Sequence, residues 1–163
     1  MANLNEITKY CNERTNCCQL KDFPGAYNGL QVENRGEISK IGAAVDAGLV
    51  PFKLAIDEGI DLLIVHHGLF WSPIEPITES NYQKIAALIQ GNLALYSNHL
   101  PLDCHPEIGN NCLLARLLEL EPEGTFLPFE GLDIGLVTHG INRDDLKERL
   151  LKSFNGKVTS IEF

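Results

Sequence analysis

The sequence predicts an α/β fold in which helices cover both faces of a largely parallel or mixed sheet. Short apolar runs at 38–45, 61–65 and 93–96 alternate with helical patterns, which is typical of strand-helix-strand units. The 163 residues, 44% of them apolar, suffice for one core that needs no disulfide or metal for stability. We therefore expect a layered α/β domain.

The elements follow from local signals. Apolar side chains recur near helical spacing over 4–18, and Asn3 with Glu6 has the offset of a cap pair, so the chain opens with a helix. Residues 21–37 are rich in Pro, Gly and Asn and predict a loop with at most one short strand. The further predicted elements are strand 38–45, helix 51–59, strand 61–65, helix 82–90, strand 93–96, helix 108–120, strand 132–137, a helix from the Asn142 cap to 154, and strand 158–163.

Composition excludes several classes of protein. The net charge of -9 repels a phosphate backbone, so nucleic acid is not an expected partner. The first twenty residues contain no apolar core of a secretory signal, and no run approaches the ~20 residues of a membrane span. Five cysteines, with Cys17 and Cys18 adjacent and no Cys-x-x-Cys pair, predict reduced thiols. We expect a soluble cytoplasmic protein.

Histidines follow two of the predicted strands. His66 and His67 come directly after 61–65, and the loop after 93–96 carries His99, Asp103 and His105. Ligands bind beyond the carboxyl ends of strands in such sheets, and imidazole with carboxylate suits a metal ion. Two structural alternatives stay open: a hydrogen-bonded histidine pair at a strand end, and an Asp103 that caps a helix. P-loop, Rossmann and serine-hydrolase motifs are absent from the sequence.

Three segments carry a family resemblance. IVHHGLFW, NGLQVE and LYSNHLPLDCHPEIGNNCLLARLL resemble segments of the Nif-three-like family of dinuclear metal-centre hexameric proteins, the GTP cyclohydrolase type two homologues. The resemblance implies a three-layer α/β/α fold, a toroidal homohexamer and two divalent ions per complete site, with Zn, Fe, Mn and Ni all open. It also implies that His66, His67 and Asp103 are metal ligands, and that His99 supports them or handles protons.

The sequence departs from this family at its end. The family completes its site with a His and a Glu of a C-terminal GHxxxE motif, which these residues lack, and His139 has no matching Glu. The resemblance thus implies a first lobe over 1–125 and the start of a second over 126–163, with a C-terminal truncation of the family fold. No role is assigned to His105 or His139.

Two functions follow as hypotheses. The first is a metal-dependent hydrolase that uses metal-activated water, with a nucleotide as possible substrate on the family name and no catalytic residue assigned. The second is a non-catalytic, metal-binding hexameric scaffold or regulator that recruits a protein partner. A purely structural role of the histidines is a third reading, because folds do not fix functions.

Overall fold

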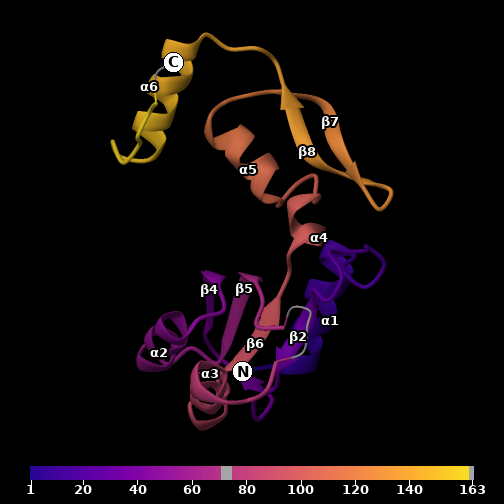
Figure 1. The fold of residues 1–163 in the computed structure, drawn as a ribbon, viewed down its shortest axis with the longest axis vertical. Helices are drawn as coiled ribbons and strands as arrows, with labels where there is room; N and C mark the ends of the chain where they lie inside the picture. The colour runs from indigo at the N-terminus through magenta and orange to yellow at the C-terminus, as the bar shows by residue number, and fades with distance from the viewer. Residues whose placement is uncertain (71–74, 162–163) are drawn as a thin grey trace. The chain divides into compact units, whose positions relative to one another are not determined.

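The computed structural model describes residues 1–70 and 75–161. They form two compact units, Met1–Leu102 and Asp103–Phe163, and each is described by itself (Figure 1). The lobes expected at 1–125 and 126–163 concern the complete family fold and stay a prediction.

The first unit is built around a four-stranded sheet of order β2-β6-β5-β4. The strands are β2 (Gly29–Val32), β4 (Ile41–Asp46), β5 (Leu62–His67) and β6 (Ala94–Ser97). β4, β5 and β6 run parallel, and β2 runs antiparallel to β6. The predicted mixed sheet is confirmed.

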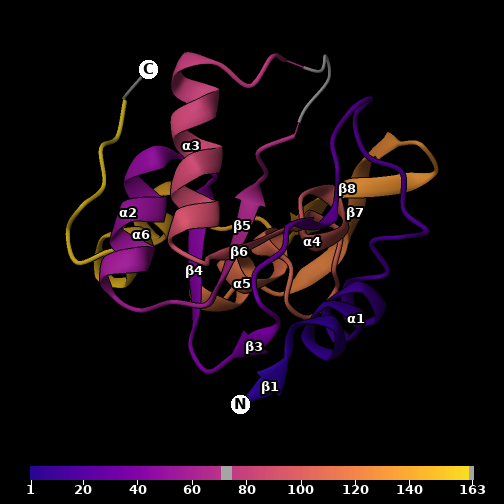
Figure 2. The same cartoon turned by 90° about the horizontal axis from the view of Figure 1, so that it is seen from below.

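Helices cover both faces of this sheet. They are α1 (Leu4–Thr15), α2 (Leu49–Asp57) and α3 (Glu79–Gln90). Alternate strand residues point to opposite faces, so Leu63 of β5 packs with α2 and α3, whereas Leu62 packs on the α1 side. Figure 2 shows α2 beside α3, with α1 across the sheet. The three-layer α/β/α architecture is confirmed.

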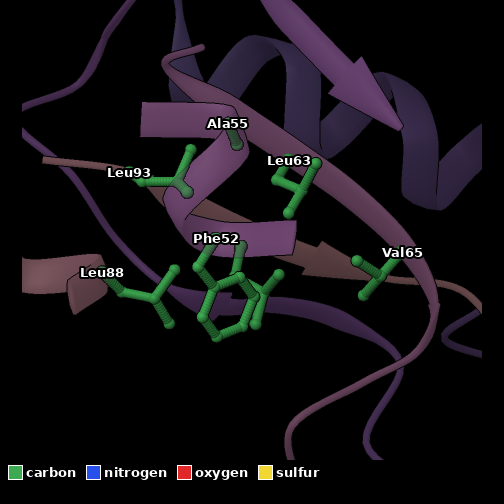
Figure 3. Packing of buried hydrophobic residues seen from close by; sticks show 7 residues of the cluster. Phe52, Ala55, Leu63, Val65, Leu88 and Leu93 are labelled. Carbon is green, nitrogen blue, oxygen red and sulfur yellow. The ribbon is translucent and has the colours of Figure 1, made fainter. Parts of the chain in front are cut away.

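The core between the sheet and the α2–α3 layer is tightly packed (Figure 3). Phe52 of α2 and Leu88 of α3 are fully buried and lie against strand side chains, among them Leu95 of β6. Burying such a side chain stabilises the fold by about 1.5–3 kcal/mol. This layer holds β5 and β6 in register and so sets the place of the residues that follow them.

The predicted first helix and its Asn3 cap are present, although a short strand precedes the helix and the helix ends at Thr15. The Asn3 side chain accepts a hydrogen bond from Asn5 N at 2.9 Å and caps α1. Two short strands, β1 (Ala2–Asn3) and β3 (Glu37–Ile38), pair antiparallel. Residues 21–37, predicted as a loop with at most one short strand, contain β2 and the first residue of β3.

The second unit contains α5 (Asn110–Leu117), the hairpin β7 (Pro122–Phe129) and β8 (Leu132–Thr138), and α6 (Arg143–Ser153). The short α4 (Leu100–Asp103) begins in the first unit and ends at Asp103, which is the first residue of the second unit. The hairpin turns at Glu130 and Gly131, both with positive φ, as a two-residue turn between antiparallel strands prefers. The predicted Asn142 cap is present, because its side chain accepts from Asp144 N at 2.8 Å.

Besides the short β1 and α4, which the sequence does not predict, two elements of the second unit differ from the prediction. The strand expected over 158–163 is wrong for 158–161, which have no regular secondary structure, and 162–163 lie outside the described residues. A strand needs a neighbour for its hydrogen bonds, and no described ladder includes 158–161. Strand β7 was not predicted, because Pro122 and Pro128 interrupt it and its side chains are almost all exposed. Within the described parts of the chain, no helix has both the length and the apolar character for crossing a membrane.

Candidate metal site

Three histidines meet at the carboxyl ends of two parallel strands. β5 ends with His66 and His67, and His99 follows β6 by two residues. The rings of His66 and His67 have centroids 4.7 Å apart, and those of His66 and His99 lie 4.8 Å apart. One potential ligand atom from each of the three lies within 4.8 Å of the others. These three side chains could hold a metal ion.

The two β5 histidines are oriented through their Nδ1 atoms. His66 Nδ1 lies 3.1 Å from the Asn98 carbonyl oxygen, and His67 Nδ1 lies 2.6 Å from Asp46 Oδ1. These oxygens only accept, so each Nδ1 is the donor, which leaves Nε2 as the atom that would face a metal ion. Metal-binding histidines usually show this arrangement. The geometry is therefore compatible with both alternatives from the sequence, a hydrogen-bonded structural pair and a pair of metal ligands.

His99 is held by a buried carboxylate. Its Nδ1 donates to Asp22 Oδ1 at 2.9 Å, and its backbone N donates to Asn28 Oδ1 at 2.7 Å. Asp22 also accepts from Asn28 Nδ2 and from the backbone N of Phe23 and Leu100. Burial raises the pKa of Asp22, but these hydrogen bonds outweigh it, so the pKa lies below its ordinary value. Asp22 is thus a fixed negative charge behind His99.

The turn after His67 is closely packed. Gln31 Oε1 accepts from Leu69 N at 2.7 Å, and Gln31 Nε2 donates to Tyr27 O at 2.7 Å. A Cβ atom on Gly68 would overlap Gln31 Nε2 and lie 2.7 Å from Ser97 Oγ. A side chain at Gly68 would therefore displace the Gln31 amide from its two hydrogen bonds, and Gln31 joins the loop before β2 to the turn that follows the two histidines.

The other candidate residues lie in the second unit. Asp103 Oδ1 accepts from Asn110 Nδ2 at 2.8 Å, so it contacts the first residue of α5. His105 is buried, and its Nδ1 accepts from the backbone N of Glu107 and Ile108, which holds the turn before α5. His139 pairs with Glu123 of β7. The ligand role of Asp103 stays a prediction.

The sequence does not identify the two carboxylates that orient the rings. Asp46 ends β4 and stands opposite His67 in the parallel register, so its position at a strand end is a usable signal. Asp22 lies in an irregular loop and reaches His99 across 77 residues. No local spacing indicates that contact.

Comparison with known proteins supports the resemblance seen in the motifs. The family described as Duf34/NIF3 (NGG1p interacting factor 3) matches residues 2–161. A Deinococcus radiodurans protein named GTP cyclohydrolase 1 type 2 homolog is 40% identical over 136 residues, which cover 78% of this chain and 52% of that protein. A Haemophilus influenzae protein of the same name is 37% identical over 163 residues, covering 99% and 61%.

Solved structures of other proteins are similar in fold to this chain. The crystal structure of TTHA1606 from Thermus thermophilus superposes with a TM-score of 0.71 at 41% identity, covering 80% of this chain and 53% of that one. Reduced HcgD from Methanocaldococcus jannaschii superposes with a TM-score of 0.73 at 32% identity, covering 92% and 59%. The chain spans 52% to 61% of the length of the two curated relatives.

Proposed function

The chain belongs to the Duf34/NIF3 family, and we propose that it is a divalent-metal-dependent hydrolase whose ion is held by His66, His67 and Asp103. The observation that carries the histidine part of this proposal is the convergence of three imidazoles at one sheet edge, each with its Nδ1 turned to an oxygen atom, whereas Asp103 enters the proposal from the family resemblance. A metal ligand must be deprotonated and oriented before the ion arrives. The hydrogen bonds of the Nδ1 atoms supply the orientation.

The donor atoms fit ions of intermediate softness. Imidazole nitrogen suits Zn, Fe and Ni, whereas Mg and Ca prefer all-oxygen surroundings. Asp103 would add an anionic oxygen, which also suits Mn. We propose two ions per complete site in a homohexamer. The His and the Glu of the family's C-terminal motif, which is not found in these residues, would complete the site. Another segment or a partner chain would supply them.

Each side chain has a task in this proposal. When bound, a divalent ion supplies Lewis acidity and makes water a nucleophile near neutral pH. His66 and His67 would hold the ion through Nε2, because the Asn98 carbonyl and Asp46 hold their Nδ1 atoms.

His99 handles the proton in the same proposal. Its Nε2 accepts a proton as water attacks the substrate. Asp22, 2.9 Å from its Nδ1, stabilises the imidazolium that results. The buried charge of Asp22 therefore serves the step without itself taking up the proton.

The substrate class rests on the relatives. Curated relatives carry the name GTP cyclohydrolase 1 type 2 homolog, so we propose a small nucleotide or another small phosphoester as substrate. The net charge of -9 does not favour a polyanion such as nucleic acid. We also propose a cytoplasmic location, where the free thiols of this chain stay largely reduced.

The test is hydrolysis by the metal-loaded chain. The protein is stripped with a chelator, reloaded separately with Zn²⁺, Mn²⁺, Fe²⁺ or Ni²⁺, and assayed with GTP and with nitrophenyl phosphoesters. We expect turnover that needs metal, is lost in His67→Ala and is kept in the matched control His139→Ala. Failure of every loaded form to exceed the metal-free protein would refute the hydrolase proposal.

A scaffold is the second candidate, because the hairpin exposes apolar side chains. Phe126 and Leu127 are 53% and 54% exposed, and Val137 is 40% exposed. Exposed apolar side chains on such a hairpin would be available for a protein contact. Asp103→Ala separates the candidates: a hydrolase loses turnover, whereas a scaffold keeps its oligomeric mass in light scattering.

A further inference from the structure

Two adjacent thiols follow the end of α1. Asn16 closes the helix in the left-handed conformation, and Cys17 and Cys18 come directly after it. Their Sγ atoms lie 4.0 Å apart, and both carry free thiols. Cys17 is 6% exposed, whereas Cys18 is exposed to solvent. The pair therefore joins one accessible sulfur atom to one buried sulfur atom.

The buried thiol belongs to a polar network. Cys17 Sγ donates to Asn12 Oδ1 at 3.2 Å and lies 3.7 Å from the Tyr96 hydroxyl. The Tyr96 hydroxyl donates to the same Asn12 oxygen at 2.9 Å. Burial raises the pKa of the Cys17 thiol. Cys17 therefore contributes a proton to the network, and the exposed Cys18 is the accessible nucleophile.

The network continues to the histidine cluster. Asn98 Nδ2 donates to the Tyr96 hydroxyl at 3.4 Å and to Thr15 Oγ1. The Asn98 carbonyl is the oxygen that holds His66 Nδ1 at 3.1 Å. Asn98 Oδ1 is buried without a hydrogen-bond partner among the described residues. An unsatisfied buried oxygen is costly, so a rearrangement around Tyr96 that brings a donor to Asn98 Oδ1 would favour a shift of Asn98.

We propose that Cys17 and Cys18 form a reversible disulfide by exchange with a small-molecule disulfide, and that closure of this bond shifts Asn98 and with it His66. The Cys18 thiolate attacks one sulfur atom of the small disulfide, forms a mixed disulfide and releases the first small thiolate. Cys17 then loses its proton, and its sulfur attacks the Cys18 sulfur and displaces the second small thiolate. The protein thiols are oxidised, and the small disulfide is reduced to two thiols that take up the two protons.

The adjacency of the cysteines makes such a bond reversible. A disulfide between neighbouring residues is strained, and strained disulfides are reduced more readily than structural ones. Closure also removes the S–H group that donates to Asn12 Oδ1, so this part-buried acceptor keeps only its hydrogen bond from the Tyr96 hydroxyl among the bonds of this network. The inference goes beyond the proposed hydrolase and requires no metal.

The first test locates the bond. The full chain, without metal, is equilibrated with graded ratios of oxidised to reduced glutathione, alkylated and digested with trypsin. The tryptic peptide 15–21 carries Cys17 and Cys18 and no other cysteine. In the oxidised samples we expect this peptide to carry no alkyl group and to be two hydrogen atoms lighter than the unalkylated dithiol peptide, and we expect dithiothreitol to restore both thiols. Two alkylated thiols at every ratio, or a persistent glutathione adduct on Cys18, would overturn the proposal.

The second test follows His66. Imidazole resonances of isotope-labelled histidine are recorded for the metal-free chain before and after oxidation, with Cys112→Ser as a control that retains the pair. We expect the His66 ring signals to shift on oxidation and to stay unchanged in Cys18→Ser under the same treatment. In Tyr96→Phe the disulfide should still form, but the shift of His66 should be lost. An unchanged His66 in the oxidised native chain would refute the coupling.

Discussion

Both carboxylate oxygens of Asp22 lie within hydrogen-bond distance of His99 Nδ1, at 2.9 and 3.1 Å. The Asp22 side chain is 3% exposed, and that of His99 is 12% exposed. Asp46 holds His67 in the same way at 2.6 Å, yet its side chain is 70% exposed. The two Asp–His pairs therefore have similar geometry in different surroundings.

This difference predicts unequal effects of the same substitution. Asp22→Asn should lower the free energy of unfolding by about 2–3 kcal/mol, because its amide group would face buried donors in place of an acceptor. Asp46→Asn should cost less than about 1 kcal/mol, since exposed pairs contribute little. Urea unfolding of the metal-free variants measures both. Equal losses would show that burial does not distinguish the pairs.

A second prediction concerns the turn after His67. Gly68→Ala should destabilise the chain by about 1–3 kcal/mol, because the added methyl group overlaps the Gln31 amide. The double variant with Gln31→Ala should recover part of this loss, with a coupling free energy of about 0.5–3 kcal/mol. Denaturant unfolding of the four proteins of this cycle gives the coupling. Strictly additive losses would contradict the contact.

The sequence predicts β5 and β6 well because they are largely buried and their residues form continuous apolar runs. That pattern also predicts where His66 and His99 lie, since the ends of neighbouring parallel strands meet. The exposed β7 shows no such pattern, because its side chains are almost all exposed and Pro122 breaks it. The Asp22–His99 contact depends on the path of an irregular loop over 77 residues. Only tertiary structure reveals it.

A third prediction tests the layer beneath the site. Leu88 of α3 is fully buried, and its neighbour Ile89 is 66% exposed. Leu88→Ala should lower the free energy of unfolding by about 2–5 kcal/mol, because it leaves a cavity between α2, α3 and the sheet. Ile89→Ala should change it by less than about 0.5 kcal/mol. Chemical unfolding of both variants checks the layer, and similar losses would place Leu88 outside the core.

A fourth prediction concerns acid stability. Hydrogen bonds from Ser39 N, Ser39 Oγ and Lys40 N hold the pKa of Asp61 below its ordinary value of 3.8. A depressed folded-state pKa means that Asp61 stabilises the fold above its unfolded-state pKa and loses this contribution as the pH falls through the folded-state pKa. As the pH is lowered from about 5 to about 2, the free energy of unfolding should therefore fall less steeply for Asp61→Asn than for the native chain. Asp57→Asn, which changes an exposed carboxylate on α2, is the control and should retain the native slope.

The last prediction uses stability to measure metal binding without any assay of activity. A ligand that binds only the folded chain raises the free energy of unfolding, by about 2.7 kcal/mol at a hundredfold excess over its dissociation constant. Zn²⁺ should stabilise the native chain in this way, EDTA should reverse it, and His66→Ala and His67→Ala should abolish it. His139→Ala, altered in the Glu123 pair of the second unit, should keep the full shift.

His99→Ala then decides how the third ring takes part. Loss of the Zn²⁺ shift in this variant would make His99 a ligand, as its position within 4.8 Å of the other two permits. A retained shift with loss of turnover would leave it the proton-handling role beside Asp22. If Zn²⁺ does not stabilise the native chain, the metal-site proposal is contradicted. The hydrogen bonds from the three Nδ1 atoms to oxygen atoms would then only hold the packed rings in place.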